Sequence, residues 1–201
     1  LASNSLSDMQ HANTNTERLP FVSVCTPTFN RRQFIPYLIE CFEQQDYPKE
    51  RMEWVIVDDG SNTVEDLVSH IPQVRYFKYE QKMTLGKKRN VMHAHAQGDI
   101  IVYMDDDDYY PPDCIQLRLS FLDERRRIQC IYTSEIDTYT TKTAKLERLG
   151  LPKFCNEATL FHTKEYWNTY KFKWEDIYNE GKHFTYGHLE ARSMPCEGLI
   201  V

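Results

Sequence analysis

Residues 100–108 read Ile-Ile-Val-Tyr-Met-Asp-Asp-Asp-Asp, an apolar run of strand length that ends in four consecutive aspartates. Two earlier apolar runs, Phe-Val-Ser-Val-Cys at 21–25 and Trp-Val-Ile-Val at 54–57, are also followed directly by polar residues. Continuous apolar runs of this kind predict strands that are covered on both faces. Segments with helical spacing separate them, and alternation of strands and helices predicts a mostly parallel sheet with right-handed crossovers.

The polar residues that follow these three strands are expected to lie together. They are Thr-Pro-Thr-Phe-Asn at 26–30, Asp-Asp-Gly-Ser at 58–61, and the aspartates at 105–108. In open α/β sheets, ligands bind beyond the carboxyl ends of the strands. The sequence therefore predicts a binding site on the rim where these three strand ends meet.

The remaining pattern predicts one α/β domain over residues 20–201. Residues 1–19 are polar and lack periodicity, which indicates a flexible lead-in. Residues 20–134 alternate regularly, whereas 135–201 are irregular and rich in aromatic residues, with a last strand expected at 198–201. The spacing predicts helices at 31–45, 62–71, 86–97 and from 111 to about 125, and strands at 74–79 and 128–132.

Composition restricts the classes of partner and compartment. The net charge is −6 and the pI is about 5.7, so no nucleic-acid partner is expected, because such proteins usually present a basic face. No apolar run reaches the ~18 residues that a membrane-spanning helix needs. Six cysteines without a Cys-x-x-Cys pair predict buried, reduced thiols and a cytoplasmic or cytoplasm-facing protein. The chain begins with Leu1, which favours a piece of a longer polypeptide with other domains.

The aspartate run predicts a cation site. Four adjacent carboxylates repel one another unless a cation lies nearby. Side chains alternate along an extended segment, so Asp105 and Asp107 share one side and Asp106 and Asp108 the other. Two carboxylates on one side suit a hard divalent ion that keeps positions open for phosphate oxygens. The alternative is a solvated acidic turn that caps a helix beginning at 111–112.

Four short motifs occur in order along the regular half of the chain. They are Val-Ser-Val-Cys-Thr-Pro-Thr-Phe-Asn-Arg at 22–31, Val-Ile-Val-Asp-Asp-Gly-Ser at 55–61, Gly-Lys-Lys-Arg-Asn at 86–90, and Tyr-Met-Asp-Asp-Asp-Asp at 103–108 followed by Pro-Asp at 112–113. In this order and spacing they resemble the family 2 glycosyltransferases with the GT-A fold. The resemblance covers 20–134 and is loose from 135 onward. It implies a Rossmann-like, mostly parallel central sheet flanked by helices, with a nucleotide-sugar-binding half and an acceptor-side half.

The resemblance implies that the first two strand ends hold the nucleotide of a UDP-sugar. Pro27 and Phe29 would line the base pocket, and Asp59 would accept a hydrogen bond from the uracil N–H. Thr28 and Asn30 would contact the ribose or a phosphate. For these two residues the alternative role is a turn that caps the following helix.

The same resemblance implies ligands for the diphosphate. Arg31 and Arg89 are the candidates, because the planar guanidinium fork matches phosphate oxygens. Asn90 follows Arg89 in the motif and would help to shape the donor site.

The aspartate run matches the DxD motif of the resembled family. The implied metal is Mn²⁺ or Mg²⁺, with Asp107 as the direct ligand. Asp105 would hold the metal through its water shell or bind the ribose, and Asp106 would also touch the ribose. The metal would neutralise the diphosphate and stabilise UDP as it leaves.

An inverting transfer, which the resemblance implies, also needs a general base for the acceptor hydroxyl. The resembled family carries an acidic residue for this role in the carboxyl-terminal third. Glu180, followed by Gly-Lys-His-Phe, is the preferred candidate, and Asp176, in a Glu-Asp pair, is the second. The alternative is that both are surface charges near a helix start.

Together these expectations describe a glycosyltransferase that moves a hexose or pentose from a UDP-sugar to a hydroxyl of a glycan, glycoprotein or glycolipid. The alternative from another class is a non-catalytic module that binds a nucleotide or a divalent cation. A sugar nucleotidyltransferase is a further alternative, although residues 26–30 lack the glycine-rich phosphate loop that such an enzyme carries.

Overall fold

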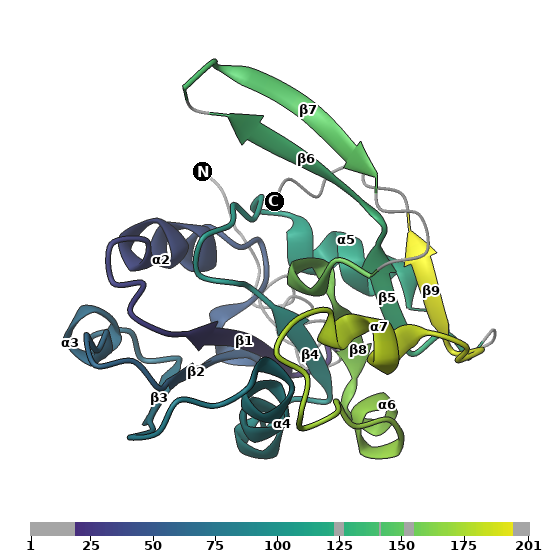
Figure 1. The fold of residues 1–201 in the computed structure, drawn as a ribbon, viewed down its shortest axis with the longest axis horizontal. Coiled ribbons are helices and arrows are strands. Elements are labelled where there is room, and N and C mark those ends of the chain that lie inside the picture. The colour runs from purple at the N-terminus through teal and green to yellow at the C-terminus, as the bar shows by residue number, and fades with distance from the viewer. Residues whose placement is uncertain (1–18, 123–126, 141, 151–154, 195–201) are drawn as a thin grey trace, which may run out of the picture.

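A computed structural model describes residues 19–122, 127–140, 142–150 and 155–194. Within these ranges one seven-stranded sheet has the order β3-β2-β1-β4-β8-β5-β9, and the β6-β7 hairpin projects away from it (Figure 1). The expected lead-in, apart from residue 19, and the expected strand at 198–201 lie outside the described residues.

The first half of the chain alternates strands and helices, as the sequence predicts. Its elements are β1 Val22–Thr28, α2 Ile35–Glu43, a 3₁₀ turn at Lys49–Arg51, β2 Met52–Asp58, α3 Glu65–Val68, β3 Val74–Lys78, α4 Leu85–His95, β4 Ile100–Tyr103, α5 Cys114–Phe121 and β5 Cys130–Thr133. Strand β1 pairs in parallel with both β2 and β4, and β2 pairs in parallel with β3. The prediction of a mostly parallel α/β sheet is therefore confirmed.

The helix expected at 62–71 is much shorter in the structure, where only α3 is helical. The carboxylate of Asp58 accepts hydrogen bonds from the backbone N–H groups of Gly60 and Val64. It also accepts one from the Tyr76 hydroxyl. These bonds hold the segment before α3 as a turn, so the helix begins only at Glu65.

Residues after 134 are more regular than the sequence indicates. They form β6 Glu135–Thr140, β7 Lys145–Gly150, a 3₁₀ turn at Glu157–Thr159, β8 Phe161–Thr163, α6 Lys164–Thr169, α7 Glu180–Thr185 and β9 Ala191–Met194. Strand β8 lies antiparallel between β4 and β5, and β9 pairs in parallel with β5. Elements of three to six residues are too short for hydrophobic periodicity to reveal them.

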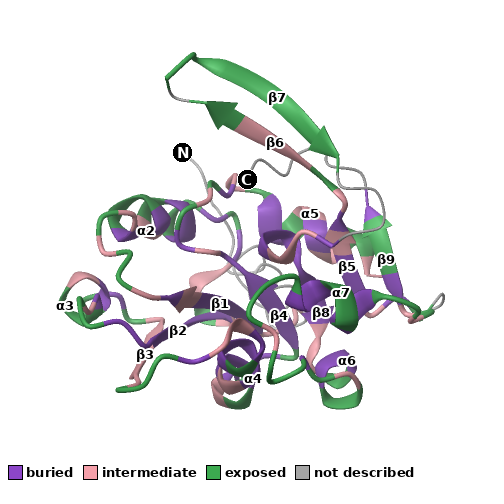
Figure 2. Ribbon diagram, in the orientation of Figure 1, coloured by how far each residue is buried: buried purple, intermediate pink, exposed green. Residues whose placement is uncertain are grey.

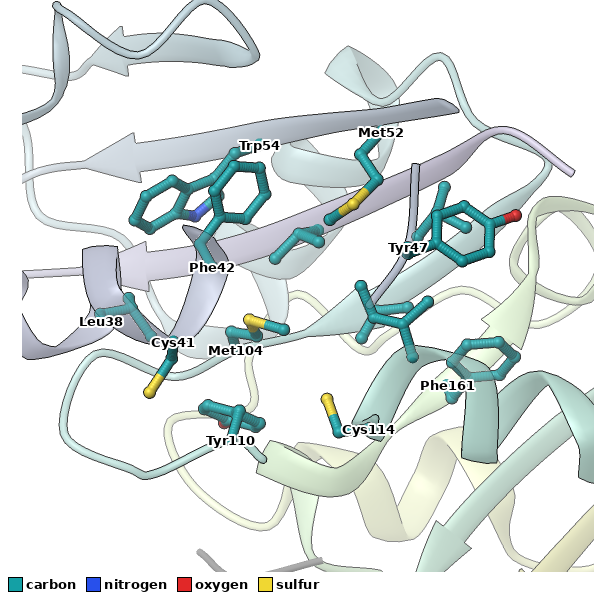
Figure 3. Close-up of a cluster of buried hydrophobic side chains, with 14 of the residues drawn as sticks. Leu38, Cys41, Phe42, Tyr47, Met52, Trp54, Met104, Tyr110, Cys114 and Phe161 are labelled. Atoms are coloured by element: carbon teal, nitrogen blue, oxygen red, sulfur yellow. The ribbon is translucent and has the colours of Figure 1, made fainter. Parts of the chain in front are cut away.

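Apolar side chains pack on both faces of the sheet. On β2, Trp54 and Ile56 join a cluster with α2, α3 and α5, whereas Val55 and Val57 join a second cluster with α4, α6 and α7. Figure 3 shows the first cluster, in which the Phe42 ring stacks on Trp54 with centroids 4.7 Å apart. Figure 2 shows the central strands as the most buried part of the fold. The apolar runs are thus covered on both sides, as predicted.

The cysteines in the described residues are all buried and unpaired, as expected for reduced thiols. They are Cys25, Cys41, Cys114, Cys130 and Cys155. Burial raises the pKa of the Cys114 thiol to about 11, so this thiol is un-ionised at neutral pH. Among the helices that the structure describes, none combines the length and apolarity needed to cross a bilayer.

Candidate active site

The carboxyl ends of β1 and β4 border a cavity of about 550 Å³. The two strands are parallel neighbours, so the polar residues that follow them reach the same edge of the sheet. The loop before α4 and the loop before α7 complete the wall. The described lining residues are Pro27, Thr28, Phe29, Arg31, Lys82, Met83, Thr84, Leu85, Lys88, Arg89, Asp105, Asp106, Asp107 and Ile177.

Four basic side chains line this cavity, and two of them, Lys82 and Lys88, lie beside the Phe29 ring. The Lys82 ammonium lies 4.1 Å from the centroid of the Phe29 ring, and the Lys88 ammonium lies 5.8 Å from it. Arg31 and Arg89 stand beside the aspartate loop. An arrangement of cations around an aromatic face suits a ligand that joins a planar ring to phosphate groups.

Two of the four aspartates are paired with these arginines. Asp107 Oδ2 lies 3.2 Å from an Arg31 terminal nitrogen, and both side chains are nearly half exposed. The carboxylate oxygens of Asp105 accept long hydrogen bonds of 3.4 and 3.3 Å from the two terminal nitrogens of Arg89. Each arginine is thus shared between the cavity and the aspartate loop.

Burial shifts the other two aspartates toward the neutral carboxyl form. Asp106 is buried and its Oδ2 has no hydrogen-bond partner. Burial first, and then the neighbouring carboxylates, raise the pKa of Asp106 to about 6 and that of Asp108 to about 8. An unpartnered carboxylate oxygen beside other hard oxygen donors fits a divalent cation. Among the described residues, no group of three or more His, Cys, Asp or Glu side chains is arranged so that it could hold a metal ion without rearrangement.

Glu180, the preferred base candidate, is buried away from the cavity lining. Its Oε1 accepts a hydrogen bond of 2.6 Å from Arg89 Nε. Glu180 begins α7, and the next residue, Gly181, donates its N–H to Glu157. The carboxylate is therefore held in an ion pair between α4 and α7, and the structure does not expose it to an acceptor.

Asp176, the second base candidate, is partly exposed. Its Oδ2 lies 3.1 Å from His183 Nδ1, and its backbone carbonyl accepts the N–H of Gly86 at 3.0 Å. A Cβ at Gly86 would meet Lys173 O at 1.9 Å, so only glycine lets the loop before α7 approach α4 this closely. The next residue, Ile177, lines the cavity.

Asp59 is buried behind the cavity wall. One carboxylate oxygen accepts the backbone N–H of Met83 at 2.6 Å, and the other forms an ion pair with Lys88. Lys88 Nζ also donates to the carbonyl of Thr28 at 3.1 Å. Burial of the ammonium lowers the pKa of Lys88, while Asp59 opposes this shift. Asp59 therefore positions Lys88 and the Met83 loop, and its predicted contact with uracil stays a prediction.

Two asparagines that the sequence assigns to the donor site form hydrogen bonds within the protein instead. Asn90 donates to the carbonyl of Phe172 at 2.8 Å and accepts from the Trp167 indole at 2.9 Å. Asn30 has a φ of 57° and accepts the N–H of Asn62 at 2.8 Å. Neither is among the lining residues of the cavity, so the structure gives both a role in loop and helix packing.

Sequence reasoning missed several lining residues on the side of α4. Lys82, Met83 and Leu85 lie between β3 and α4, and Ile177 lies far along the chain. The basic charge of Lys82, four residues before the Gly86 motif, is a weak signal that it could face a phosphate. Nothing in the sequence around Ile177 places it near the donor site.

The sequence profile of Glycosyl transferase family 2 matches residues 23–193. The chain is 32% identical over 114 residues to poly(ribitol-phosphate) beta-N-acetylglucosaminyltransferase TarS of Staphylococcus aureus. This alignment covers 51% of the chain and 19% of TarS. It is 28% identical over 167 residues to chondroitin synthase of Escherichia coli, covering 76% of this chain and 24% of that enzyme. The chain thus spans a quarter or less of these relatives.

Solved structures share the fold. TarS 1-349 of S. aureus in complex with UDP superposes with a TM-score of 0.66 at 20% identity, covering 81% of this chain and 53% of that one. The mannosyltransferase PcManGT from Pyrobaculum calidifontis, in complex with GDP-Man and Mn²⁺, superposes with a TM-score of 0.68 at 17% identity, covering 91% and 56%. These likenesses establish a GT-A-like fold. With a family profile that spans most of its length, the chain belongs to glycosyl transferase family 2.

Proposed function

We propose that the chain transfers a sugar from a UDP-sugar to an acceptor hydroxyl, with a divalent cation and with inversion. The observation that carries this proposal is the cavity that four basic side chains and three aspartates line together. The basic side chains can bind a diphosphate, and the aspartates can bind the metal ion that accompanies it. The TarS structure in complex with UDP supports the choice of nucleotide.

The donor would lie along the β1 side of the cavity. Phe29 and Pro27 offer a surface for the base, and Lys82 lies close to the Phe29 ring. Arg31 and Arg89 would bind the diphosphate, since each has terminal nitrogens directed to the same loop. Asp59 would contribute to donor binding indirectly, because its ion pair with Lys88 holds that side chain at the cavity wall.

Asp105 and Asp107 would hold Mn²⁺ or Mg²⁺, since both line the donor cavity. When bound, the metal would neutralise the diphosphate and stabilise the UDP leaving group. The ion pair between Arg31 and Asp107 is largely exposed, so exchanging Asp107 for a phosphate costs Arg31 little. Arg31 would then exchange its contact with Asp107 for one with a donor phosphate.

Asp176 is the better general base, which reverses the order that the sequence favoured. Glu180 is buried and its carboxylate is engaged by Arg89. Asp176 is partly exposed, lies 3.1 Å from His183 Nδ1, and precedes Ile177, which lines the cavity. Asp176 would take the proton of the acceptor hydroxyl as its oxygen attacks the anomeric carbon and UDP departs.

Release of UDP from UDP-sugars, measured in the presence of Mn²⁺, tests this proposal. We expect slow hydrolysis of at least one donor by the wild type, and loss of that activity in Asp107→Ala. Asp46→Ala, which removes an exposed carboxylate outside the cavity, serves as the matched control. Donor binding without any release of UDP, with or without acceptor, would favour the non-catalytic alternative instead.

A further inference from the structure

A second cavity of about 400 Å³ lies against the other side of the aspartate loop, and the function proposed above leaves it unused. Its volume falls in the range of about 300–1,000 Å³ that is usual for small-ligand sites. One face of α2 forms one wall and the loop after β4 forms the other. The described lining residues are Phe34, Tyr37, Glu40, Cys41, Gln44, Asp106, Asp107, Asp108 and Tyr109.

Aromatic rings dominate the apolar part of this second cavity. Tyr37 is 69% exposed and Tyr109 is 49% exposed, although both line a concave surface. Phe34 and Tyr37 lie three residues apart at the start of α2, with Cys41 and Gln44 one and two turns further along the same face. Large exposed aromatic side chains gathered at a cavity mark a contact surface.

The charge of the second cavity is opposite to the cations of the first. Glu40 and three aspartates line it, and the part of the lining that the structure describes contains no lysine or arginine. The described lining therefore offers a phosphate carboxyl groups and no basic partner, so it does not suit the donor nucleotide. Carboxylates accept hydrogen bonds from hydroxyls, and the buried Asp106 Oδ2 is an acceptor without a partner.

We propose that the second cavity is a subsite for a neutral sugar ring of the acceptor. The C–H face of such a ring would pack on Tyr37 and Tyr109, and its hydroxyls would donate to Glu40 and Asp106. Asp106 and Asp107 line both cavities, so a ring bound here adjoins the donor across the aspartate loop. This assignment rests on the proposed function, because it gives the two cavities to the two substrates of one transfer.

A glycan array that displays neutral, anionic and amine-bearing oligosaccharides tests the subsite directly. The variants are the double substitution Tyr37→Ala with Tyr109→Ala, and Tyr186→Ala as the matched control, since Tyr186 is 70% exposed and lies outside the cavity. We expect the wild type and Tyr186→Ala to bind neutral glycans, and the double variant to bind them roughly tenfold more weakly, the scale of losing an aromatic contact residue. Gln44→Trp, which fills the cavity from an exposed helix end, is an independent second variant with the same expected loss.

The outcomes separate the subsite from the proposed function. Equal glycan binding by wild type and both cavity variants would overturn the subsite, as would binding restricted to amine-bearing or anionic glycans, or no binding of glycans. UDP is titrated in parallel with Mn²⁺. Failure of the wild type to bind UDP, with glycan binding intact, would overturn the proposed function and the acceptor role, and would leave a carbohydrate site alone.

Discussion

Arg89 and Glu180 form a buried ion pair that joins α4 to α7. Arg89 Nε lies 2.6 Å from Glu180 Oε1, and the side chains are 3% and 2% exposed. The same guanidinium lies 4.3 Å from the Tyr103 ring centroid and reaches Asp105 with its terminal nitrogens. One buried cation therefore connects the aspartate loop of the donor cavity to the helix that follows the Asp176 loop.

Removing Glu180 should destabilise the fold. Glu180→Ala leaves Arg89 buried without this partner, and breaking a buried pair in this way costs about 3–5 kcal/mol. Glu175→Ala, which removes an exposed carboxylate five residues earlier, should change the free energy of unfolding by about 0.5 kcal/mol or less. Urea unfolding measures both values. Equal midpoints for the two variants would show that the ion pair does not stabilise the fold.

Asp176→Asn should reduce sugar transfer while leaving UDP affinity unchanged. Loss of a general base typically lowers the rate roughly 10²-fold or more. The amide still accepts a hydrogen bond, so the loop before α7 should keep its place. Turnover is measured with saturating donor, and Glu175→Gln is the control. Wild-type turnover by Asp176→Asn would return the role of base to Glu180.

Two adjacent arginines offer a matched test of the diphosphate site. Arg31 lines the donor cavity, whereas Arg32 is bonded to Asp66 outside it. Arg31→Ala should weaken UDP binding by roughly 10- to 100-fold, the range for a lost hydrogen bond to a charged group. Arg32→Ala should bind UDP as the wild type does. Calorimetric titration gives both affinities, and an equal loss in the two variants would argue against a specific diphosphate contact.

His162 should make the fold sensitive to acid. Its ring is fully buried on β8, and burial lowers the pKa of His162 to about 4, whereas the unfolded value is about 6.5. Between these pH values the unfolded chain binds a proton that the folded chain does not. The contribution of His162 to the free energy of unfolding is therefore fully present above about pH 6.5. Below that pH it falls by about 1.4 kcal/mol per pH unit.

The variant His162→Asn isolates this contribution, because asparagine does not titrate and can still donate toward the Thr163 carbonyl that His162 Nδ1 contacts. From pH 7.5 to pH 5, wild-type stability should fall by about 2 kcal/mol more than that of the variant. Titrating groups that do not contact His162 cancel in the difference, whereas the buried His93, whose ring centroid lies 5.0 Å from that of His162, remains in both proteins. Parallel pH profiles would exclude His162 as a source of acid sensitivity.

The sequence predicts the sheet well where the signal is local. The apolar runs at 21–25, 54–57 and 100–104 become the adjacent strands β1, β2 and β4, because strands covered on both faces are mostly apolar. Strands β8 and β9 have three and four residues; β8 pairs between β4 and β5, and β9 pairs with β5 at the edge of the sheet. Their positions depend on tertiary pairing, which no local pattern reports.

The roles of individual site residues were harder to predict, because their partners are distant in sequence. Lys88 resembles an ordinary solvated lysine on a helix, yet it is buried against Asp59, 29 residues away. Glu180 resembles a base in a motif, yet its partner Arg89 lies 91 residues away. A charged residue shows its function only when the group that neutralises it is known.

Titration of UDP in the presence of Mn²⁺, and again with EDTA, tests the central claim most directly. The account predicts that the wild type binds UDP only when the metal is present. It also predicts that Asp107→Ala loses this binding and unfolds at the same temperature as the wild type, because Asp107 is exposed and its ion pair is weak. Full UDP affinity in Asp107→Ala, or in EDTA, would contradict a metal-dependent donor site at the aspartate loop.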